Sequence, residues 1–372
     1  MNTLILSCST GQGHNSCARA IEEYYRQTQD HCTVKDALAL ISQDLSSFLS
    51  WGHATMYRYI PSLFRWGYSF SEGHQSLFRQ GGVAYRLLVK GCDALYQLIL
   101  EGGYDSVICA HPFAAVMMTR ILQDHPGLVV TANLATDYVC HPGIDQTRLD
   151  LYFAPDESLR SSFKSGSIAL SQVIPSGIPV RQMFYGHPDH LRNDPSREMH
   201  LLMMCGSMGC GPIEELTDQI TRIMGSNVQL SVVCGTNRPL YRRLTKAYAG
   251  EERVQILGYV KDMAGLMAKA DLCLTKPGGI SVTECAVMGL PMVLIDAVSG
   301  CEEYNRRFFT ALGGARSGKS VKELAELSLE LLGEPEVLSA MRQRLLRRNR
   351  ENSALIIHDH MKEMVKEKHE TA

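Results

Sequence analysis

The 372-residue sequence lacks several features that would assign it to a common protein class. Its formal net charge is only −2, without the basic excess typical of general nucleic-acid-binding proteins. No stretch reaches the roughly 20 consecutive apolar residues that cross a bilayer, and residues 3–9 lack the flanks of a signal peptide. We therefore expect a cytoplasmic protein that contacts membranes only peripherally.

The sequence also lacks a CxxC pair, although it contains 12 cysteines. Several of them, such as Cys109, Cys234 and Cys273, lie inside apolar runs, which is typical of buried free thiols in a reducing compartment. Cys205 and Cys210 are close in sequence, but no matching His or Cys pair completes a zinc site. We expect neither a disulfide framework nor a bound metal.

What the sequence does contain is an alternation of short apolar runs and helical stretches. Apolar runs without clean alternation predict parallel strands that are covered on both faces. We predict strands over residues 3–9, 105–110, 128–134, 151–154, 201–205, 230–234, 254–257, 272–275 and 292–295. Intervening helices include residues 16–27, 261–270 and 281–288. The length and this alternation together predict two doubly wound, Rossmann-like α/β domains that face each other across a cleft.

Turn and breaker residues concentrate between residues 179 and 198, in Tyr185-Gly186-His187-Pro188 and Asn193-Asp194-Pro195. We therefore predict an N-terminal domain over residues 1–180, a C-terminal domain over 198–340 and a helical segment over 341–372. Residues 341–350 carry five arginines, for which a solvated helical face is the simpler interpretation.

The most informative motif follows the predicted strand at 272–275. It reads Lys276-Pro277-Gly278-Gly279-Ile280-Ser281-Val282-Thr283-Glu284. Glycines at a strand–helix junction let the backbone approach a phosphate, and the helix start offers unpaired N–H groups. Glu284, one turn into the helix, is placed to accept hydrogen bonds from ribose hydroxyls. Glycines at such a junction are also common as plain turns.

An acidic motif, Gly300-Cys301-Glu302-Glu303-Tyr304-Asn305, follows the predicted strand at 292–295. Carboxylates at a helix start are often simple capping residues. Near a nucleotide site they can instead accept hydrogen bonds from the hydroxyls of a sugar. Because both loops should lie at the carboxyl edge of one parallel sheet, we favour the second interpretation.

At the N-terminus, Gly11-Gln12-Gly13-His14 closes the first strand and opens the first helix. The motif is not a dinucleotide fingerprint, because Ser16 stands where a third glycine is needed, and it is not a Walker loop. A lone histidine is usually structural, but His14 lies where a parallel sheet exposes its loops. The ordinary pKa of histidine suits proton abstraction near neutral pH.

Seven motifs occur along the chain in a fixed order. They are Gly11-Gln12-Gly13-His14, His111-Pro112-Phe113, Thr136-Asp137-Tyr138 with His141-Pro142, Ser176-Gly177-Ile178-Pro179-Val180, Gly258-Tyr259-Val260, Lys276-Pro277-Gly278-Gly279 and Glu302-Glu303-Tyr304-Asn305. This set resembles the monogalactosyldiacylglycerol synthase and processive diacylglycerol glucosyltransferase family over residues 3 to about 350. It is more distantly similar to the N-acetylglucosaminyltransferase that completes the lipid-linked peptidoglycan precursor.

The resemblance implies a GT-B fold, with an N-terminal acceptor domain, a C-terminal donor domain and a last helix that crosses back. It implies inverting transfer from a UDP-sugar without a metal. His14 would be the general base, and Asp137 a second candidate or an orienting group. Independently of the resemblance, a helix dipole and N–H groups can stabilise a leaving diphosphate.

For the donor, the resemblance implies contacts that run along the second domain. Val260 would meet uracil and Glu284 the ribose. The diphosphate would lie on Gly278, Gly279, Ile280 and Ser281, with Gly206-Ser207 as a second phosphate-facing loop. The sugar would face Glu302, Glu303 and Asn305.

Two departures from the family pattern bear on specificity. Cys301 stands where family members commonly have Gln before the first Glu of the acidic motif, which leaves the identity of the sugar open. The usual Trp near the Asp137 motif is absent, and Gly143-Ile144 stands there instead.

Residues 45–91 combine aromatic and basic side chains, including Trp51, Arg58, Arg65 and Trp66, with only one acid, Glu72. This composition is typical of a segment that binds an anionic lipid surface, although an aromatic core gives the same pattern. Since relatives admit lipid through this region, we expect membrane contact there, and we assign Gly13 to the acceptor side.

Four functions follow, in order of preference. The first is transfer of glucose or galactose from UDP to diacylglycerol or a glycosyl-diacylglycerol. The second is transfer of N-acetylglucosamine from UDP to a polyprenyl-linked or other lipid acceptor. A sugar-nucleotide epimerase of the same fold and a non-catalytic UDP-sugar sensor remain as alternatives.

Overall fold

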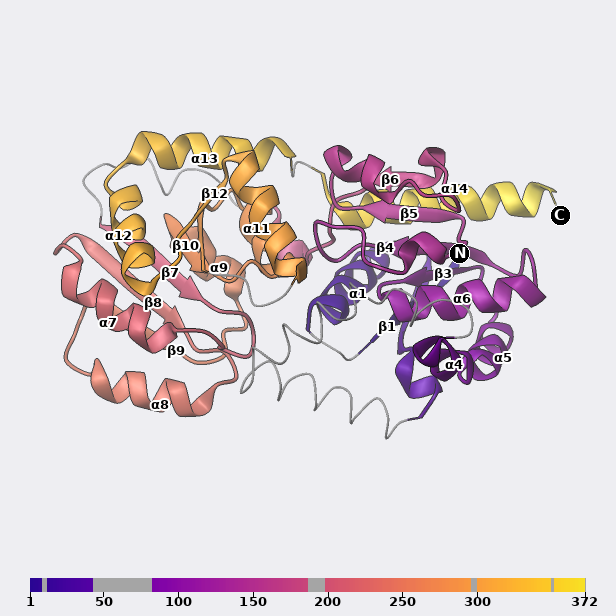
Figure 1. The fold of residues 1–372 in the computed structure, drawn as a ribbon, viewed down its shortest axis with the longest axis horizontal. Coiled ribbons are helices and arrows are strands. Elements are labelled where there is room, and N and C mark those ends of the chain that lie inside the picture. The colour runs from indigo at the N-terminus through magenta and orange to yellow at the C-terminus, as the bar shows by residue number, and fades with distance from the viewer. Residues whose placement is uncertain (9–11, 43–81, 187–197, 296–299, 349–350, 372) are drawn as a thin grey trace. The chain divides into compact units, whose positions relative to one another are not determined.

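The computed structural model describes residues 1–372 except 9–11, 43–81, 187–197, 296–299, 349–350 and 372 (Figure 1). The chain forms two compact units. The first consists of residues 1–182, 299–301 and 351–372, and the second of residues 183–298 and 302–350. The first unit therefore includes the C-terminal segment.

The first unit is built on a six-stranded parallel sheet in the order β2-β1-β3-β4-β5-β6. The strands are β1 (Asn2–Ser7), β2 (His31–Asp36), β3 (Ser106–Cys109), β4 (Val130–Leu134), β5 (Leu151–Ala154) and β6 (Val173–Pro175). Strands β3, β4 and β5 are buried along their whole length, as expected for parallel strands between helical layers.

Helices cover both faces of this sheet. They are α1 (Gln12–Tyr25), α4 (Val83–Val89), α5 (Cys92–Gly102), α6 (Pro112–Asp124) and α14 (Ser353–Thr371). Short 3-10 helices occupy Leu38–Leu40, Ile144–Gln146, Glu157–Phe163 and Leu170–Gln172. Helix α14 packs against α1 and β4, whereas α4 and α5 pack with α6 (Figure 1).

The second unit repeats the architecture with a parallel sheet in the order β12-β11-β10-β7-β8-β9. Its strands are β7 (Met199–Met204), β8 (Val228–Val233), β9 (Val254–Leu257), β10 (Leu272–Thr275), β11 (Met292–Leu294) and β12 (Ala315–Ser317). The prediction of two doubly wound α/β domains is confirmed.

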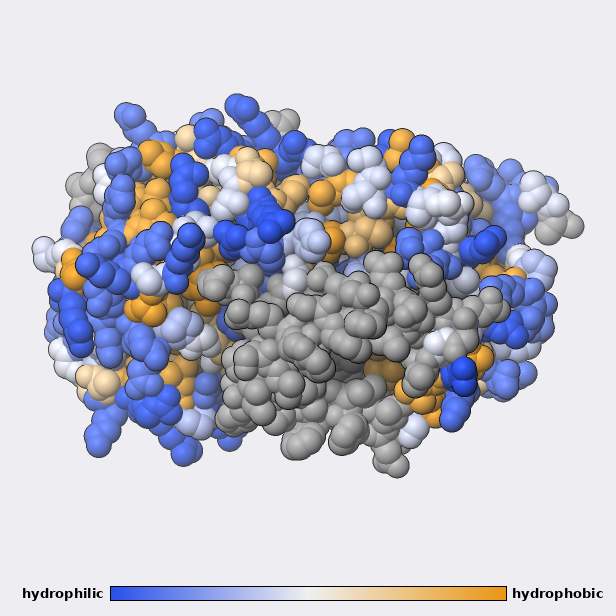
Figure 2. Space-filling view, in the orientation of Figure 1, coloured by the Kyte–Doolittle hydropathy of each residue, from blue (hydrophilic) through white to orange (hydrophobic). Residues whose placement is uncertain are grey.

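Seven helices among the described residues follow the strands of this second sheet. They are α7 (Ile213–Ile223), α8 (Arg238–Ala247), α9 (Met263–Lys269), α10 (Gly279–Val287), α11 (Gly300–Leu312), α12 (Val321–Leu332) and α13 (Pro335–Arg348). Helices α7 and α8 bury residues at helical spacing, such as Leu216 with Ile220 and Leu240 with Leu244. Their visible outer faces are mostly hydrophilic (Figure 2).

The C-terminal segment divides at a different residue from the predicted boundary at 341. Helix α13 belongs to the second unit, because Met341 and Leu345 are fully buried there. The segment that joins the first unit begins at residue 351 and forms α14. The described part of the arginine-rich stretch, residues 341–348, therefore lies on an amphipathic helix of the second unit, where Arg342 also donates to the carbonyl of Gly289 at 3.3 Å.

Candidate active site

The first candidate site lies at the carboxyl edge of the first sheet, between β1 and β3. The chain runs from β1 to β2 on one side and reaches β3 on the other, so the loops after β1 and β3 diverge at this point. Open α/β sheets bind ligands at such a switch point. Gly13 and His14, both half-buried in the first turn of α1, lie at this edge.

His14 is held in a defined orientation by the loop after β3. Its Nδ1 lies 2.7 Å from the carbonyl oxygen of Ala110, and 3.1 Å from Oγ1 of Thr136. Because a carbonyl oxygen can only accept, Nδ1 must carry the hydrogen, and in neutral imidazole the lone pair is then on Nε2. This tautomer is the one that a general base requires.

A second histidine, His111, contacts the first. The two rings lie 4.5 Å apart between centroids at an interplanar angle of 63°. His111 caps α6, since its Nδ1 accepts a hydrogen bond from the backbone N–H of Phe113 at 3.1 Å. His111 lies in one of the seven sequence motifs, and only the fold shows that it contacts His14, because residues 14 and 111 are far apart in the sequence.

Asp137 lies in the loop after β4, one residue beyond Thr136. Its Oδ2 is 3.3 Å from Nε2 of His141, and both side chains are mostly buried. The structure therefore brings the predicted second carboxylate to the same sheet edge as His14. In the same loop, the hydroxyl of Thr136 lies 3.1 Å from Nδ1 of His14.

One trio among the described residues offers metal-ligating atoms close together. Asp137, His141 and Cys301, which groups with the first unit, place one such atom each within 4.8 Å of one another. The carboxylate, imidazole and thiol set is of a kind that zinc accepts. The expectation that the enzyme needs no metal stays a prediction.

The second candidate site lies at the carboxyl edge of the second sheet, around the start of α10. Gly278 is the N-cap of α10 and provides no side-chain cap, and the first turn carries no acidic residue. The N–H groups of Gly279, Ile280 and Ser281 have no intrahelical acceptor. This is the arrangement that binds phosphate at a helix N-terminus.

The loop after β7 faces the start of α10 across a second switch point, since β7 and β10 are neighbours whose following loops diverge. Gly209 in this loop has φ +56°, and a Cβ there would lie 2.1 Å from the carbonyl oxygen of Cys234. The close approach is fixed by a hydrogen bond of 2.8 Å from the backbone N–H of Thr236 to the carbonyl of Ser207. Gly206, also at positive φ, and the exposed Ser207 are thereby held at the sheet edge.

Lys276 lies in the glycine-rich motif but has no predicted role of its own. Its side chain is buried and bridges the two loops, because a methyl group on Gly211 would lie 3.4 Å from its Cε. Burial raises the pKa of the nearby Cys205 thiol to about 12, while the charge of Lys276 lowers it and that of Glu302 raises it. The structure thus brings a cation and a carboxylate to the predicted phosphate loops.

The three residues of the acidic motif have different environments. Glu302 is buried, whereas Glu303 binds Arg306 and Arg307 on its own helix at 2.7 and 2.6 Å. Hydrogen bonds from Arg306, and then Arg307, hold the pKa of Glu303 below its usual value. Asn305 is fully buried and donates from Nδ2 to the carbonyl of Pro277 at 2.9 Å. Asn305 therefore braces the phosphate loop, and a contact with the sugar stays a prediction for all three.

The remaining donor residues lie along the same edge. Glu284 is half-buried in α10, and Val260 is half-buried after β9, just before the Asp262 cap of α9. Three strand spacings separate β9 from β10, which is about 14 Å. The predicted base and phosphate contacts are therefore spread over a length that suits an extended nucleoside diphosphate.

The predicted membrane-contact residues Trp51, Arg58, Arg65 and Trp66 lie outside the described residues. Within the part of the chain that the structure describes, no helix has the length and apolarity needed to span a bilayer.

Comparisons with known proteins agree with this arrangement. The family described as monogalactosyldiacylglycerol (MGDG) synthase matches residues 14–180, and the glycosyltransferase family 28 C-terminal domain matches residues 200–364. A crystal structure of MurG from Acinetobacter baumannii aligns with 98% of this chain and 100% of that chain, at a TM-score of 0.67 and 14% identity. The fold and the two sites define a glycosyltransferase of the GT-B class.

Two curated relatives narrow the class. The processive diacylglycerol beta-glucosyltransferase of Bacillus subtilis is 28% identical, over 98% of this chain and 96% of the relative. A probable chloroplastic monogalactosyldiacylglycerol synthase of Nicotiana tabacum is 28% identical, over 98% of this chain and 71% of the relative. The chain is thus similar in its N-terminal part to the monogalactosyldiacylglycerol synthase family, and along nearly its whole length to processive diacylglycerol glucosyltransferases.

Proposed function

We propose that this enzyme transfers glucose or galactose from a UDP-sugar to diacylglycerol or a glycosyl-diacylglycerol, with inversion at the anomeric carbon. The observation that carries the proposal is the fixed orientation of His14. Its Nδ1–H donates to Ala110, which puts a basic Nε2 at the ligand edge of the acceptor domain. The names of the relatives support the lipid acceptor, since two of them act on or form glycosylated diacylglycerol.

In the proposed reaction, Nε2 of His14 takes the proton from the acceptor hydroxyl as its oxygen attacks the anomeric carbon. The bond between that carbon and the diphosphate oxygen breaks, and UDP leaves with the electron pair. The N–H groups at the start of α10 and the cation of Lys276 stabilise the charge that develops on the diphosphate. These groups belong to the chain itself, so the proposal includes no resident metal.

The proposal places the enzyme in the cytoplasm, on the inner face of the cell membrane. The mixture of tryptophans and arginines over residues 45–91 supports binding to anionic lipid. Vesicle sedimentation tests this part. Wild-type protein should sediment with anionic vesicles, and a variant with Trp51→Ala and Trp66→Ala should sediment less. Equal sedimentation of the two proteins would contradict the assignment of this segment.

A second function is transfer of N-acetylglucosamine to a polyprenyl-linked lipid. The observation that keeps it open is Cys301, which stands where the resemblance leads us to expect Gln beside the sugar and so leaves the identity of the sugar undefined. Purified enzyme is therefore incubated with diacylglycerol vesicles and UDP-glucose, UDP-galactose or UDP-N-acetylglucosamine in parallel, and the lipids are analysed by mass spectrometry. A hexosyl-diacylglycerol supports the first function. Measurable UDP binding without any glycosylated diacylglycerol would contradict it, and polyprenyl acceptors would then be tested.

A further inference from the structure

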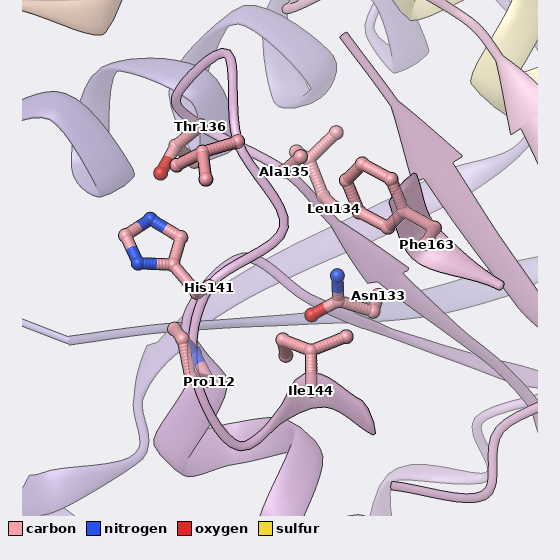
Figure 3. Close-up of a pocket in the computed structure, with 9 residues that line it drawn as sticks. Pro112, Asn133, Leu134, Ala135, Thr136, His141, Ile144 and Phe163 are labelled. Atoms are coloured by element: carbon pink, nitrogen blue, oxygen red, sulfur yellow. The ribbon is translucent and has the colours of Figure 1, made fainter. Parts of the chain in front are cut away.

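A small pocket in the first unit lies beside the candidate base and contains Asn133, a residue that has no role assigned above. It opens below the loop that follows β4, and its wall is mostly apolar (Figure 3). Leu134, Ile144 and Phe163 supply much of this wall. The interior has room for about one water-sized group, so it suits a single hydroxyl rather than a whole sugar ring.

Asn133 is the polar residue inside this pocket. Its side chain is only 3% exposed, and no described residue donates a hydrogen bond to Oδ1. In Figure 3 the carboxamide oxygen is directed towards the side of the pocket where Pro112 and His141 lie. Buried acceptors without a partner are uncommon in native structures, because they forfeit a hydrogen bond that water would supply. The pocket therefore lacks a donor that a bound molecule would provide.

The position of the pocket connects it with the acceptor. Thr136, which also lines it, places its hydroxyl 3.1 Å from Nδ1 of His14. Pro112, on another side, directly follows His111, whose ring contacts His14. Two walls of the pocket are thus in contact with the residues that hold the candidate base.

The lining also restricts the charge of the occupant. Among the described residues around the pocket there is no lysine or arginine, and His141 is the one titratable group. A phosphate would find no lysine or arginine to pair with, and His141 already pairs with Asp137, whereas a neutral hydroxyl on an aliphatic carbon fits the mostly apolar wall.

We infer that this pocket is a hydroxyl-binding subsite for a neutral lipid acceptor, with Asn133 Oδ1 as the hydrogen-bond acceptor. The inference rests on the proposed function and adds a residue that determines acceptor specificity. The hydroxyl has two sources, the glycerol backbone of diacylglycerol or the hexose of a glycosyl-diacylglycerol. An ordered water alone is the competing occupant.

The test measures binding of the acceptor lipid rather than transfer of the sugar. A negative result for the subsite can therefore be distinguished from a negative result for the proposed reaction. Binding of dioctanoylglycerol and of hexosyl-dioctanoylglycerol is measured by calorimetry for wild type, Asn133→Leu and Asn133→Ser, with UDP as a second ligand. Asn133→Leu keeps a similar volume and removes the acceptor, and should weaken lipid binding about tenfold without changing the affinity for UDP. Asn133→Ser retains an oxygen and should lose less.

The two lipids distinguish the sources of the hydroxyl. Weaker binding of dioctanoylglycerol alone by Asn133→Leu assigns the pocket to the free glycerol hydroxyl, and weaker binding of the hexosyl lipid alone assigns it to the sugar. Weaker binding of both assigns it to the hydroxyl that each lipid presents to the acceptor domain. The subsite is refuted if wild type binds neither lipid. It is also refuted if wild type and Asn133→Leu bind the lipids equally well while both retain UDP binding and the same melting temperature. In either case the pocket holds water only.

Discussion

Replacing Asp30 by asparagine should loosen helix α14 from the first unit. The side chain of Asp30 is 6% exposed, and its Oδ2 accepts hydrogen bonds from Nε2 of His358 at 2.8 Å and from Nζ of Lys362 at 2.9 Å. Burial by itself raises the pKa of Asp30, but hydrogen bonds from the amino group of Met1, from Lys362 and from His358 outweigh it. The pKa is therefore held well below its ordinary value.

The magnitude follows from the burial of the two partners. A hydrogen bond to a charged group contributes about 1.5–3 kcal/mol, against about 1 kcal/mol for a neutral pair. His358 is as buried as Asp30, whereas Lys362 is 57% exposed and adds little. We expect Asp30→Asn to lower the free energy of unfolding by about 2 kcal/mol, or the melting temperature by roughly 4–8 °C.

The pH dependence has a definite sign. A carboxyl whose folded pKa is depressed stabilises the fold above its unfolded pKa of about 3.9, and this stability is lost as the pH falls further. The difference between wild type and Asp30→Asn should therefore be constant near neutral pH and shrink below about pH 4. Glu370→Gln is the control, because its pair with Lys366 on the same helix is exposed and should contribute nothing measurable. Equal melting temperatures of wild type and Asp30→Asn at pH 7 would refute the role of this ion pair.

Three further predictions concern catalysis. Thr136→Val removes the hydroxyl 3.1 Å from Nδ1 of His14 and should lower kcat about fivefold, with KM for the donor unchanged; a change in the donor KM alone would contradict this role. Glu284→Gln should raise KM for the UDP-sugar by about tenfold or more if the carboxylate binds the ribose, and an unchanged KM would remove it from the donor site. Treatment with EDTA should leave the rate of transfer unchanged, because the N–H groups of α10 and the cation of Lys276 are the proposed stabilisers of the diphosphate. A loss of activity that magnesium restores would contradict this expectation.

The sequence predicted all the central strands and one edge strand, β9, and it missed three strands that lie at the sheet edges. Strands β2 and β6 are the two edges of the first sheet, and β12 is an edge of the second. Each has a partly exposed burial pattern, and β6 and β12 have three residues each. An edge strand has one neighbour and is only partly covered, so it lacks the apolar run that marks a central parallel strand.

The candidate sites, too, could be predicted only in part from the sequence. Motifs at strand–helix junctions could be placed at one sheet edge from the sequence, because parallel strands put all their following loops at the same end. The contacts of Asn305 with Pro277, of Lys276 with the loop of Gly211, and of His14 with Ala110 could not be predicted. Each joins segments that are far apart in the sequence, and only the packed fold determines which atoms meet.

The most direct measurement of the central proposal is the lipid product of wild type and His14→Ala, assayed side by side. Both proteins are incubated with UDP-glucose or UDP-galactose and anionic vesicles that contain diacylglycerol, and the products are resolved by mass spectrometry. The account predicts a hexosyl-diacylglycerol from wild type with one of the donors, and a rate lower by 10²–10⁴-fold for His14→Ala, on the order expected for loss of a general base, with unchanged UDP binding. Equal product from the two proteins would contradict the role of His14, and no glycolipid from wild type would contradict the proposed reaction.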